Sequence, residues 1–518
     1  MKRTKYIIPF AIIIVAMFFA ASCSKNLDVL PENRTFTAET DYTKTSDMIN
    51  PLLGVYAGMS VTDGEWEDFP IIGVRGDDVN AGGGSDQPDL AATDKYNYNR
   101  TFWALNTFWE AYYQHLFASQ SAMEQIALFK AKISSGNTEA LARADQYTAE
   151  VKVLEAWWLL QVSRVWGPIF IPTSSDPASL FVTPLSSKDE VMKRISDLMD
   201  EASPLLPAIR PNERTDIPGG VTKYTALALK ALANLELKNY DGVAAATGEI
   251  INSNKFILEP DFYQLFKLKG KLNNENLLEK QYSDLGTNAN PKFYYKFEFF
   301  GPQSWTPKLA TAGGGWGFYE PSLKYIKFML DRGDTLRLKT TVIFTPRGIA
   351  EIEKDASYTP KMAGITNVSR SGDIFIDFDR EMFLSGKHYL PSDQLTSGQT
   401  TYGTNKNFSC IRYAQILLMY AEALTQGATG SAGTADNAVN LVRARAGLTA
   451  ITGVTNDQVM DEKFAELATE WGDRFYDMVR LGKTAELSYE GRIFTMDKTF
   501  LPYPENQVSI LPALSVKK

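Results

Sequence analysis

The chain has 518 residues, of which 44% are hydrophobic, 12% aromatic and 22% charged, and its formal net charge at pH 7 is −8. This length is ample for a large hydrophobic core, and the acidic balance argues against binding to nucleic acid or, by charge, to anionic lipid. Only two cysteines and two histidines occur, which leaves few parts for a histidine-rich metal site or for Ser-His and Cys-His nucleophiles.

The first 22 residues have the pattern of a bacterial export signal. Three basic residues precede an uncharged apolar run at 6–21, and the small residues 20–22 come directly before Cys23. A secreted chain that otherwise avoids cysteine has little use for a free thiol at this place. We therefore interpret Cys23 as the lipidated N-terminus of the mature chain, with acyl chains that anchor it to a membrane. The alternative is an ordinary cleaved signal in which Cys23 is incidental.

Residues 23–45 are polar and lack helical periodicity, so they are predicted to form a tether, and residues 46–518 to form a single domain. Apolar residues at helical spacing predict two long helices at 101–129 and 138–167, the second ending at Gly167 and Pro168. A third helix is predicted at 187–202. Its first residues, Ser187 and Glu190, have the spacing of a capping box.

A loose internal repeat follows these helices. The stretch KYTALALKALANLEL at 223–237 resembles RYAQILLMYAEALTQ at 412–426, and each is followed by a second helical pattern, at 241–253 and at 434–448. Small residues in these patterns allow two helices to approach closely. Helix pairs of this kind are the unit of tetratricopeptide-like arrays, so the repeat predicts such an array.

Between residues 259 and 408 the sequence changes character, because Gly, Pro, Asn and Tyr interrupt every pattern. The stretches KFYYKFEFF at 292–300 and DIFIDFDRE at 373–381 alternate as short strands do. Long irregular segments in compact proteins are usually functional. The sequence therefore predicts a mainly α protein with a helical scaffold at about 100–258 and 409–485, an irregular ligand-binding insertion at about 259–408, and an extended C-terminal segment at 486–518.

Motifs at both ends of the chain carry a family resemblance. Near the start, Cys23 is followed by Leu27, Asp28 and Pro31. Near the end stand ELATEWGDRFYDMVRLGK at 466–483 and the Leu-Pro-Tyr-Pro motif at 501–504. With these motifs the chain resembles the SusD/RagB family of lipid-anchored substrate-binding partners of TonB-dependent transporters in Bacteroidetes-type outer membranes. Two positions depart from the family pattern: Trp471 separates Glu470 from Gly472, and Leu511 replaces the Asn of a final Asn-Pro.

The resemblance implies a SusD-like α-α superhelix that binds an oligomeric nutrient, most often a glycan, on loops that project from the scaffold. It also implies a SusC-like TonB-dependent transporter as partner, a cell-surface location on the outer membrane, no catalysis and no cofactor. In the C-terminal block, Leu467, Trp471, Phe475 and Met478 are spaced as one apolar helical stripe, and Glu470 and Arg474 as an i, i+4 pair. We expect this block to be scaffold.

Three tryptophans lie outside helical patterns and are candidates to stack on sugar rings: Trp66, Trp305 and Trp316. The alternative is that each one packs a loop onto the body, and the Gly-rich setting of Trp316 favours that alternative. Tyr282 and Tyr319 are further aromatic candidates. The other six tryptophans, which we expect in the core, are Trp103, Trp109, Trp157, Trp158, Trp166 and Trp471.

The stretch GVRGDDVNAGGG offers Arg75, Asp77 and Asp78 as polar contacts for sugar hydroxyls, although the two aspartates are equally suited to capping a turn. Its glycines do not have the spacing of a phosphate-binding loop, and no calcium-binding loop pattern occurs, so we predict no metal site. Cys410 is expected at the start of a buried helix, and His115 in a packed or surface helix.

Three alternatives to glycan capture remain open at this stage. The ligand of such a binding protein is a peptide, the chain is a surface glycoside hydrolase, or it is purely a protein-interaction scaffold. A hydrolase needs two carboxyl groups held across a cleft, with the pKa of one of them raised, and no sequence motif indicates such a pair.

Overall fold

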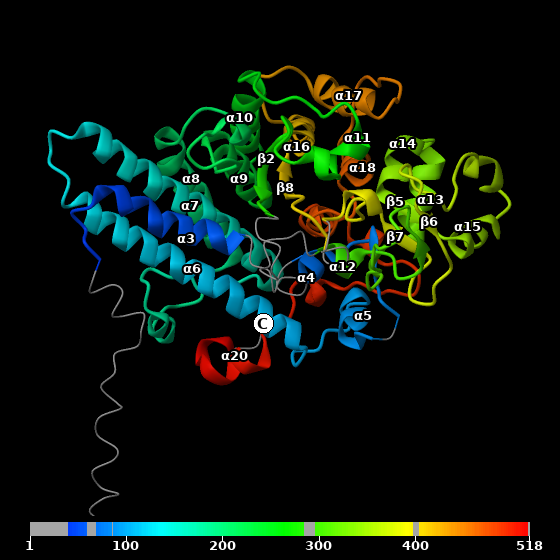
Figure 1. Cartoon of the computed structure of the whole chain (residues 1–518), viewed down its shortest axis with the longest axis horizontal. Helices are drawn as coiled ribbons and strands as arrows, with labels where there is room; N and C mark the ends of the chain where they lie inside the picture. The colour runs from blue at the N-terminus through cyan, green and yellow to red at the C-terminus, as the bar shows by residue number, and fades with distance from the viewer. Residues whose placement is uncertain (1–39, 60–68, 85, 284–295, 397–402, 516–518) are drawn as a thin grey trace, which may run out of the picture.

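The computed structural model describes residues 40–515 apart from 60–68, 85, 284–295 and 397–402. The predicted signal, most of the tether, Cys23 and Trp66 lie outside the described residues. Figure 1 shows the long helices gathered on one side of the molecule and the insertion, with its short helices and strands, on the other. No helix of the described part is both long and apolar enough to cross a membrane.

The scaffold is a continuous series of packed helices, which confirms the predicted mainly α, tetratricopeptide-like class. Each helix contacts the next in the series. Helix α10 contacts α16, so the two helices that flank the insertion in sequence are neighbours in space. The predicted capping box is present, since Ser187 Oγ accepts from the N–H of Glu190 at 3.3 Å and Glu190 Oε2 accepts from the N–H of Ser187 at 2.7 Å. The helices of the series are α6 (Trp103–Lys130), α7 (Thr138–Trp166), α8 (Lys188–Ala202), α9 (Lys223–Glu236), α10 (Tyr240–Asn252), α16 (Tyr413–Thr425), α17 (Ala435–Arg445) and α18 (Asn456–Leu467).

The internal repeat corresponds to the helix pairs α9–α10 and α16–α17, which stack side by side through α10 and α16. The two helices meet at Gly248 of α10, where a Cβ would be in ordinary contact with the ring of Tyr420 in α16, at 3.5 Å. The hydroxyl of Tyr420 then accepts from the N–H of Ala432 at 2.7 Å and donates to the carbonyl of Gly433 at 3.0 Å, which fixes the loop before α17.

Helical structure begins earlier than the sequence indicated. Helix α3 (Ile49–Met59) packs against α6 and α7 with Leu52 and Val55 fully buried, so the helical body starts well before residue 100. Trp103, expected in the core, is 47% exposed at the start of α6, whereas the other five helical-pattern tryptophans are buried. Two short helices follow α3, namely α4 (Phe69–Gly73) and α5 (Pro88–Asp94).

The insertion contains short antiparallel two-stranded sheets and several short helices. Helices were not predicted here, and the stretch expected as a strand at 292–300 is a helix where it is described, at Lys296–Phe300 (α12). The reason is that Phe297, Phe299 and Phe300 are all buried, so no exposed face alternates with a buried one. Cys410, expected at the start of a helix, lies in a strand.

The two-stranded sheets are β1 (Val79–Gly82) with β4 (Phe318–Pro321), β2 (Asn276–Lys280) with β8 (Phe408–Arg412), β3 (Trp305–Thr306) with β6 (Ile374–Phe375), and β5 (Val342–Phe344) with β7 (Phe383–Ser385). The short helices are α11 (Phe262–Leu265), α13 (Leu323–Arg332), α14 (Thr335–Thr341) and α15 (Pro346–Glu353).

The C-terminal block does not form the single helix that its apolar stripe predicted. Helix α18 ends at Leu467 and α19 (Asp473–Arg480) starts anew, because Thr469 and Gly472 have φ of +63° and +71°. A side chain at Gly472 would lie 2.8 Å from the carbonyl oxygen of Ile72, so the break lets the chain approach the N-terminal segment. The last segment is not extended throughout, since α20 (Glu505–Ile510) packs against α6.

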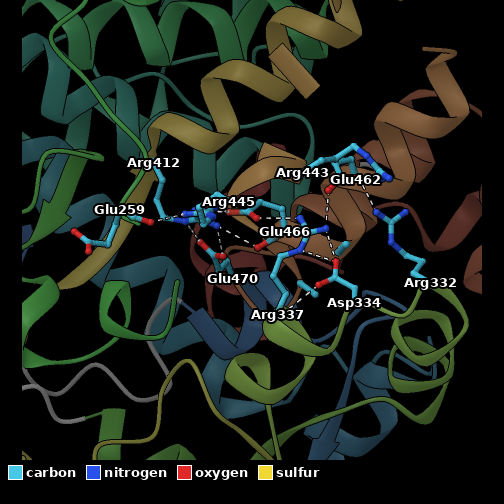
Figure 2. A network of polar contacts seen from close by, with 12 residues as sticks. Glu259, Arg332, Asp334, Arg337, Arg412, Arg443, Arg445, Glu462, Glu466 and Glu470 are labelled. Carbon is cyan, nitrogen blue, oxygen red and sulfur yellow. Dashed lines mark hydrogen bonds and ion pairs between the residues drawn. The ribbon is translucent and has the colours of Figure 1, made fainter. Parts of the chain in front are cut away.

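A buried network of charged side chains fastens the insertion to the scaffold (Figure 2). Arg337 of α14 contacts Glu462 at 2.6 Å and Glu466 at 3.1 Å, both on α18. Arg412, the last residue of β8, contacts the same Glu466 at 2.9 Å. Burial alone would raise the pKa of Glu466, but the guanidinium groups of Arg445, Arg412 and Arg337 hold that pKa well below its usual range. The carboxylate therefore stays ionised and joins three segments.

Candidate functional site

A cavity of about 520 Å³ opens on the insertion, between α14, β5 and residues 364–370. Its volume lies within the range of sites that hold small ligands, and most of its wall is apolar, as in such sites. Aromatic rings come from Tyr263, Phe344 and Tyr389. The remaining lining residues are Asp261, Leu336, Lys339, Thr340, Val342, Ile343, Gly364, Ile365, Thr366, Val368, Ser369, Arg370 and Gly386.

Tyr389 is held in place by the buried carboxylate of Asp373, to which its hydroxyl donates. The same carboxylate accepts from the N–H and the hydroxyl of Ser392, at 3.0 and 2.6 Å, and from the N–H of Lys308 at 2.7 Å. One carboxylate thus connects the segment after β3, the start of β6 and the segment after Tyr389. This arrangement fixes one wall of the cavity without a regular sheet.

Trp305 lies beside this cavity. It begins β3 and is partly buried, and its ring lies nearly parallel to that of Phe375 in the paired strand β6, with centroids 6.3 Å apart. The ring also meets Tyr389 edge-on at 6.3 Å. Tyr389 therefore contacts Trp305 with one part of its ring environment and lines the cavity with another, so it connects the two. Trp305 is thus a sequence-proposed aromatic residue whose ring contacts a ring of the cavity lining.

Apolar side chains are exposed around the same place. Ile374 and Ile376 are exposed on either side of the buried Phe375, as expected for a strand with one buried face. Val368, which bridges to Ile374, and Leu336 of α14 are also exposed, and both line the cavity. Val368 and Leu336 thus form an exposed apolar rim on which the C–H face of a sugar can pack, and Trp305, which is not a lining residue, adjoins the cavity through Tyr389.

Two cations flank the ring of Tyr263. Lys267 Nζ lies 4.7 Å from the ring centroid, and the Arg370 guanidinium lies 5.0 Å from it. Lys267 is fully buried and donates to the carbonyl oxygens of Gly386 and Tyr389, at 2.6 and 2.8 Å, so it fixes the floor behind Tyr389. Burial, with a smaller effect from the nearby cation of Lys406, lowers the pKa of Lys267 well below its usual value.

The polar candidates Arg75, Asp77 and Asp78 are not at the surface that the sequence suggested: all three are fully buried, which favours a structural role over contact with a ligand. Arg75 donates to the carbonyl of Thr499 at 2.9 Å, and Asp78 accepts from the N–H of Thr469 at 2.6 Å. Burial raises the pKa of Asp78 to about 7. The polar, glycine-flanked pattern suggested a loop. It is instead the seam between the N-terminal and C-terminal parts of the chain.

Two of the aromatic candidates are also core residues. Tyr282 and Tyr319 are buried, and Tyr319 has φ of +65° in β4 beneath Gly73, where a side chain would collide with its hydroxyl. Trp316 is partly buried, with its backbone N–H donating to the carbonyl of Glu298 at 2.7 Å and its ring packed near Phe299. These positions favour packing for all three, as the glycine-rich setting of Trp316 had suggested.

Sequence reasoning missed most of the cavity. Tyr263 and Tyr389 are far apart in sequence and each follows or precedes ordinary helical or turn residues, so no local pattern marks them. Lys339 and Arg370 are single cations within polar stretches. The available signal was the irregular composition of 259–408, which indicated the correct region without its residues.

Comparisons with known proteins agree with this architecture. A model described as "SusD family" matches residues 274–510. The chain is 24% identical over 550 aligned positions to "SusD-like protein P38" of Formosa agariphila, an alignment that covers 97% of this chain and 96% of the relative.

Solved structures share the fold. A "Laminarin binding SusD-like protein" superposes with a TM-score of 0.73 at 22% identity, covering 90% of this chain and 97% of that one. "Surface glycan-binding protein A from Bacteroides thetaiotaomicron in complex with laminarihexaose" gives a TM-score of 0.71 at 21% identity, covering 91% and 98%.

Proposed function

The chain belongs to the SusD family, and from this premise we propose that it captures an oligomeric glycan at the cell surface and passes it to a TonB-dependent outer-membrane transporter. The observation that carries the proposal is the cavity beside Trp305, with its apolar rim and fixed aromatic wall. Two structures with the same fold are named for glycan binding, which supports the same ligand class.

Binding in this proposal combines two kinds of contact. The apolar face of a sugar ring packs on Trp305 and the exposed side chains Val368 and Leu336, while hydroxyl groups exchange hydrogen bonds with polar side chains of the lining such as Thr366 and Ser369. Because Asp373 and Lys267 fix Tyr389 from behind, the wall is ordered before the ligand arrives. Less conformational entropy is then lost on binding.

The proposed role is non-catalytic. Glycoside hydrolysis by paired carboxyl groups needs two of them across the ligand, and the described lining holds a single carboxylate, that of Asp261, which forms an ion pair with Arg370 at 2.8 Å. Lipidation of Cys23 is the proposed anchor. The packed helical series is the proposed rigid body that docks on the transporter.

A binding screen tests the proposal. The full-length protein, purified in detergent, is titrated calorimetrically with a panel of oligosaccharides of several linkages and with a panel of peptides, and each reaction is later analysed for cleavage products. We expect saturable binding to at least one oligosaccharide and no cleavage. Binding to peptides alone, or turnover of a glycan, would contradict the proposal.

A further inference from the structure

One exposed cation of the cavity lining, Lys339, extends from one lining segment toward another. Lys339 belongs to the last turn of α14 and is exposed, and its Nζ extends toward Gly364 on the facing wall, where a Cβ would lie 3.2 Å from the nitrogen. Gly364 has φ of +75°, so the turn itself requires glycine. The ammonium group therefore lies between two segments that line the cavity, α14 and the turn at Gly364.

The charge of Lys339 is not compensated locally. Among the described lining residues only two others are charged, Arg370 and Asp261, and these pair with each other at 2.8 Å. Within the described part of the chain, Lys339 forms neither an ion pair nor a side-chain hydrogen bond. Two cations against one carboxylate leave the lining with one net positive charge, in a chain whose formal charge is −8.

A lysine in the last turn of a helix also interacts favourably with the partial negative charge of the helix end, and this role needs no ligand. That role accounts for a cation on α14 but not for the position of its Nζ at the opposite wall. The two explanations differ in what they predict. A helix-end role affects stability alone, whereas a ligand role affects the preference for a charged ligand.

We propose that the cavity selects sugar units that carry an anionic group, a carboxylate or a sulfate ester, and that Lys339 is the residue that recognises this group. The inference rests on the proposed glycan-binding function and specifies its ligand class. The anionic oxygens accept charge-assisted hydrogen bonds from Lys339 Nζ, while the sugar ring packs on the rim residues Leu336 and Val368. Since the chain as a whole is acidic, a single uncompensated cation decides where an anion can sit.

The test uses two matched pairs of oligosaccharides with the full-length protein in detergent. One pair is an oligogalacturonate and its fully methyl-esterified form, and the other is a sulfated galactan oligosaccharide and its desulfated form. We expect the charged member of at least one pair to bind about tenfold more tightly than its neutral counterpart, with a preference that weakens as salt is added. The pair that shows the preference distinguishes a carboxylate from a sulfate.

Three variants assign the preference to its residue. Lys339→Gln is expected to abolish the preference and Lys339→Arg to keep most of it. Lys193→Gln, which removes an exposed lysine from α8 in the scaffold and changes the net charge equally, is expected to leave it intact.

Each other outcome overturns the inference. Equal affinity for the charged and neutral members, or a preference that survives Lys339→Gln, would remove Lys339 as the selecting residue. A lower melting temperature in Lys339→Gln with an unchanged preference would leave only the helix-end role. Tight binding of neutral glycans alone would overturn the selection and leave the proposed function standing, whereas no glycan binding of any kind would overturn both.

Discussion

The guanidinium of Arg474 pairs with the carboxylate of Asp77, Nε to Oδ1 at 2.8 Å, across 397 positions of sequence. Its expected partner, Glu470, contacts Arg412 and Lys387 instead, each at 2.7 Å. The break between α18 and α19 separates Glu470 from Arg474. A pair that would have contributed a few tenths of a kcal/mol on one exposed helix is thus replaced by buried long-range contacts between segments.

The raised pKa of Asp78, the residue after Asp77, predicts that folding stability depends on pH. Burial raises the pKa of Asp78 to about 7, above its value near 3.8 in the unfolded chain. Between these values the folded state binds the extra proton, so the contribution of Asp78 is present at low pH and is lost as pH rises toward 7 and beyond. We expect Asp78→Asn, which stays neutral, to gain stability relative to the wild type as pH rises from 5 to 8, by at most about 1.4 kcal/mol per pH unit.

Urea unfolding at several pH values measures this difference, and the exposed Asp497→Asn serves as control because its carboxyl is on the surface. A constant difference between Asp78→Asn and the wild type across the range would mean that Asp78 titrates as an ordinary carboxyl.

We predict that Glu466→Gln causes a large loss of folding stability. Replacing it by Gln removes the charge that Arg337, Arg412 and Arg445 share, and leaves three buried guanidinium groups short of a counterion. Removing one partner from a buried ion network costs about 3–5 kcal/mol. Denaturant unfolding should show this loss. Glu351→Gln, which breaks the exposed pair with Lys354, should change stability by about 0–1 kcal/mol.

We predict that truncation of Trp305 lowers the affinity for glycan. Truncation to Ala removes the ring that adjoins the cavity through Tyr389 and is expected to weaken binding by about 1–3 kcal/mol. Because the ring also packs on Phe375 and Tyr389, we now expect a lower melting temperature as well, which an exposed loop residue would not have shown. Trp305→Phe should recover much of both losses.

Trp103→Ala is the matched control, because this exposed tryptophan lies on α6 in the scaffold. Unchanged glycan affinity in Trp305→Ala would exclude Trp305 from the binding surface.

We predict that Cys23 carries the lipid that anchors the protein to the membrane. Cys23→Ala removes the only sulfur available for acylation after the small residues 20–22. We expect the variant to leave the membrane fraction and to incorporate no labelled fatty acid. Cys410→Ala should remain attached, because this second cysteine is buried in β8. Acyl labelling that persists in Cys23→Ala would place the anchor elsewhere.

The proposed partner predicts a stable complex in the outer membrane. Gentle solubilisation and affinity isolation of the tagged protein should recover a TonB-dependent barrel from the same cell. The complex should survive Trp305→Ala, because Trp305 is proposed to bind the ligand and not the barrel. Isolation of the protein alone, under conditions that preserve other barrel complexes, would contradict this partner.

The sequence predicted the helical pairs well because their signals are local. Apolar spacing and the Ser187 cap depend on residues within one or two turns, and the repeat in α9 and α16 is visible by alignment alone. The insertion was not predictable in the same way. Phe297, Phe299 and Phe300 are buried together, so their spacing carries neither a strand nor a helix period.

The candidate site illustrates the same difference at the level of single residues. Arg75, Asp77 and Asp78 have the composition of an exposed polar loop, and only their distant partners Arg474, Thr469 and Thr499 show that they are buried. Tyr389 becomes a cavity wall through Asp373, which no local pattern connects to it. In both cases, contacts between segments that are far apart in sequence determine whether the residue is buried or lines the cavity.

The strands β2 and β8 form one ribbon, so the chain enters and leaves the insertion through two hydrogen-bonded neighbours while α10 and α16 stack as though nothing lay between them. A segment attached in this way can lengthen, shorten or be exchanged with little disturbance to the helices on either side. The ion pairs of Arg332 and Arg337 with Glu462 are among the connections that an exchanged segment would have to reproduce. The architecture thus allows the insertion, which carries the proposed ligand cavity, to change while the helical body is kept.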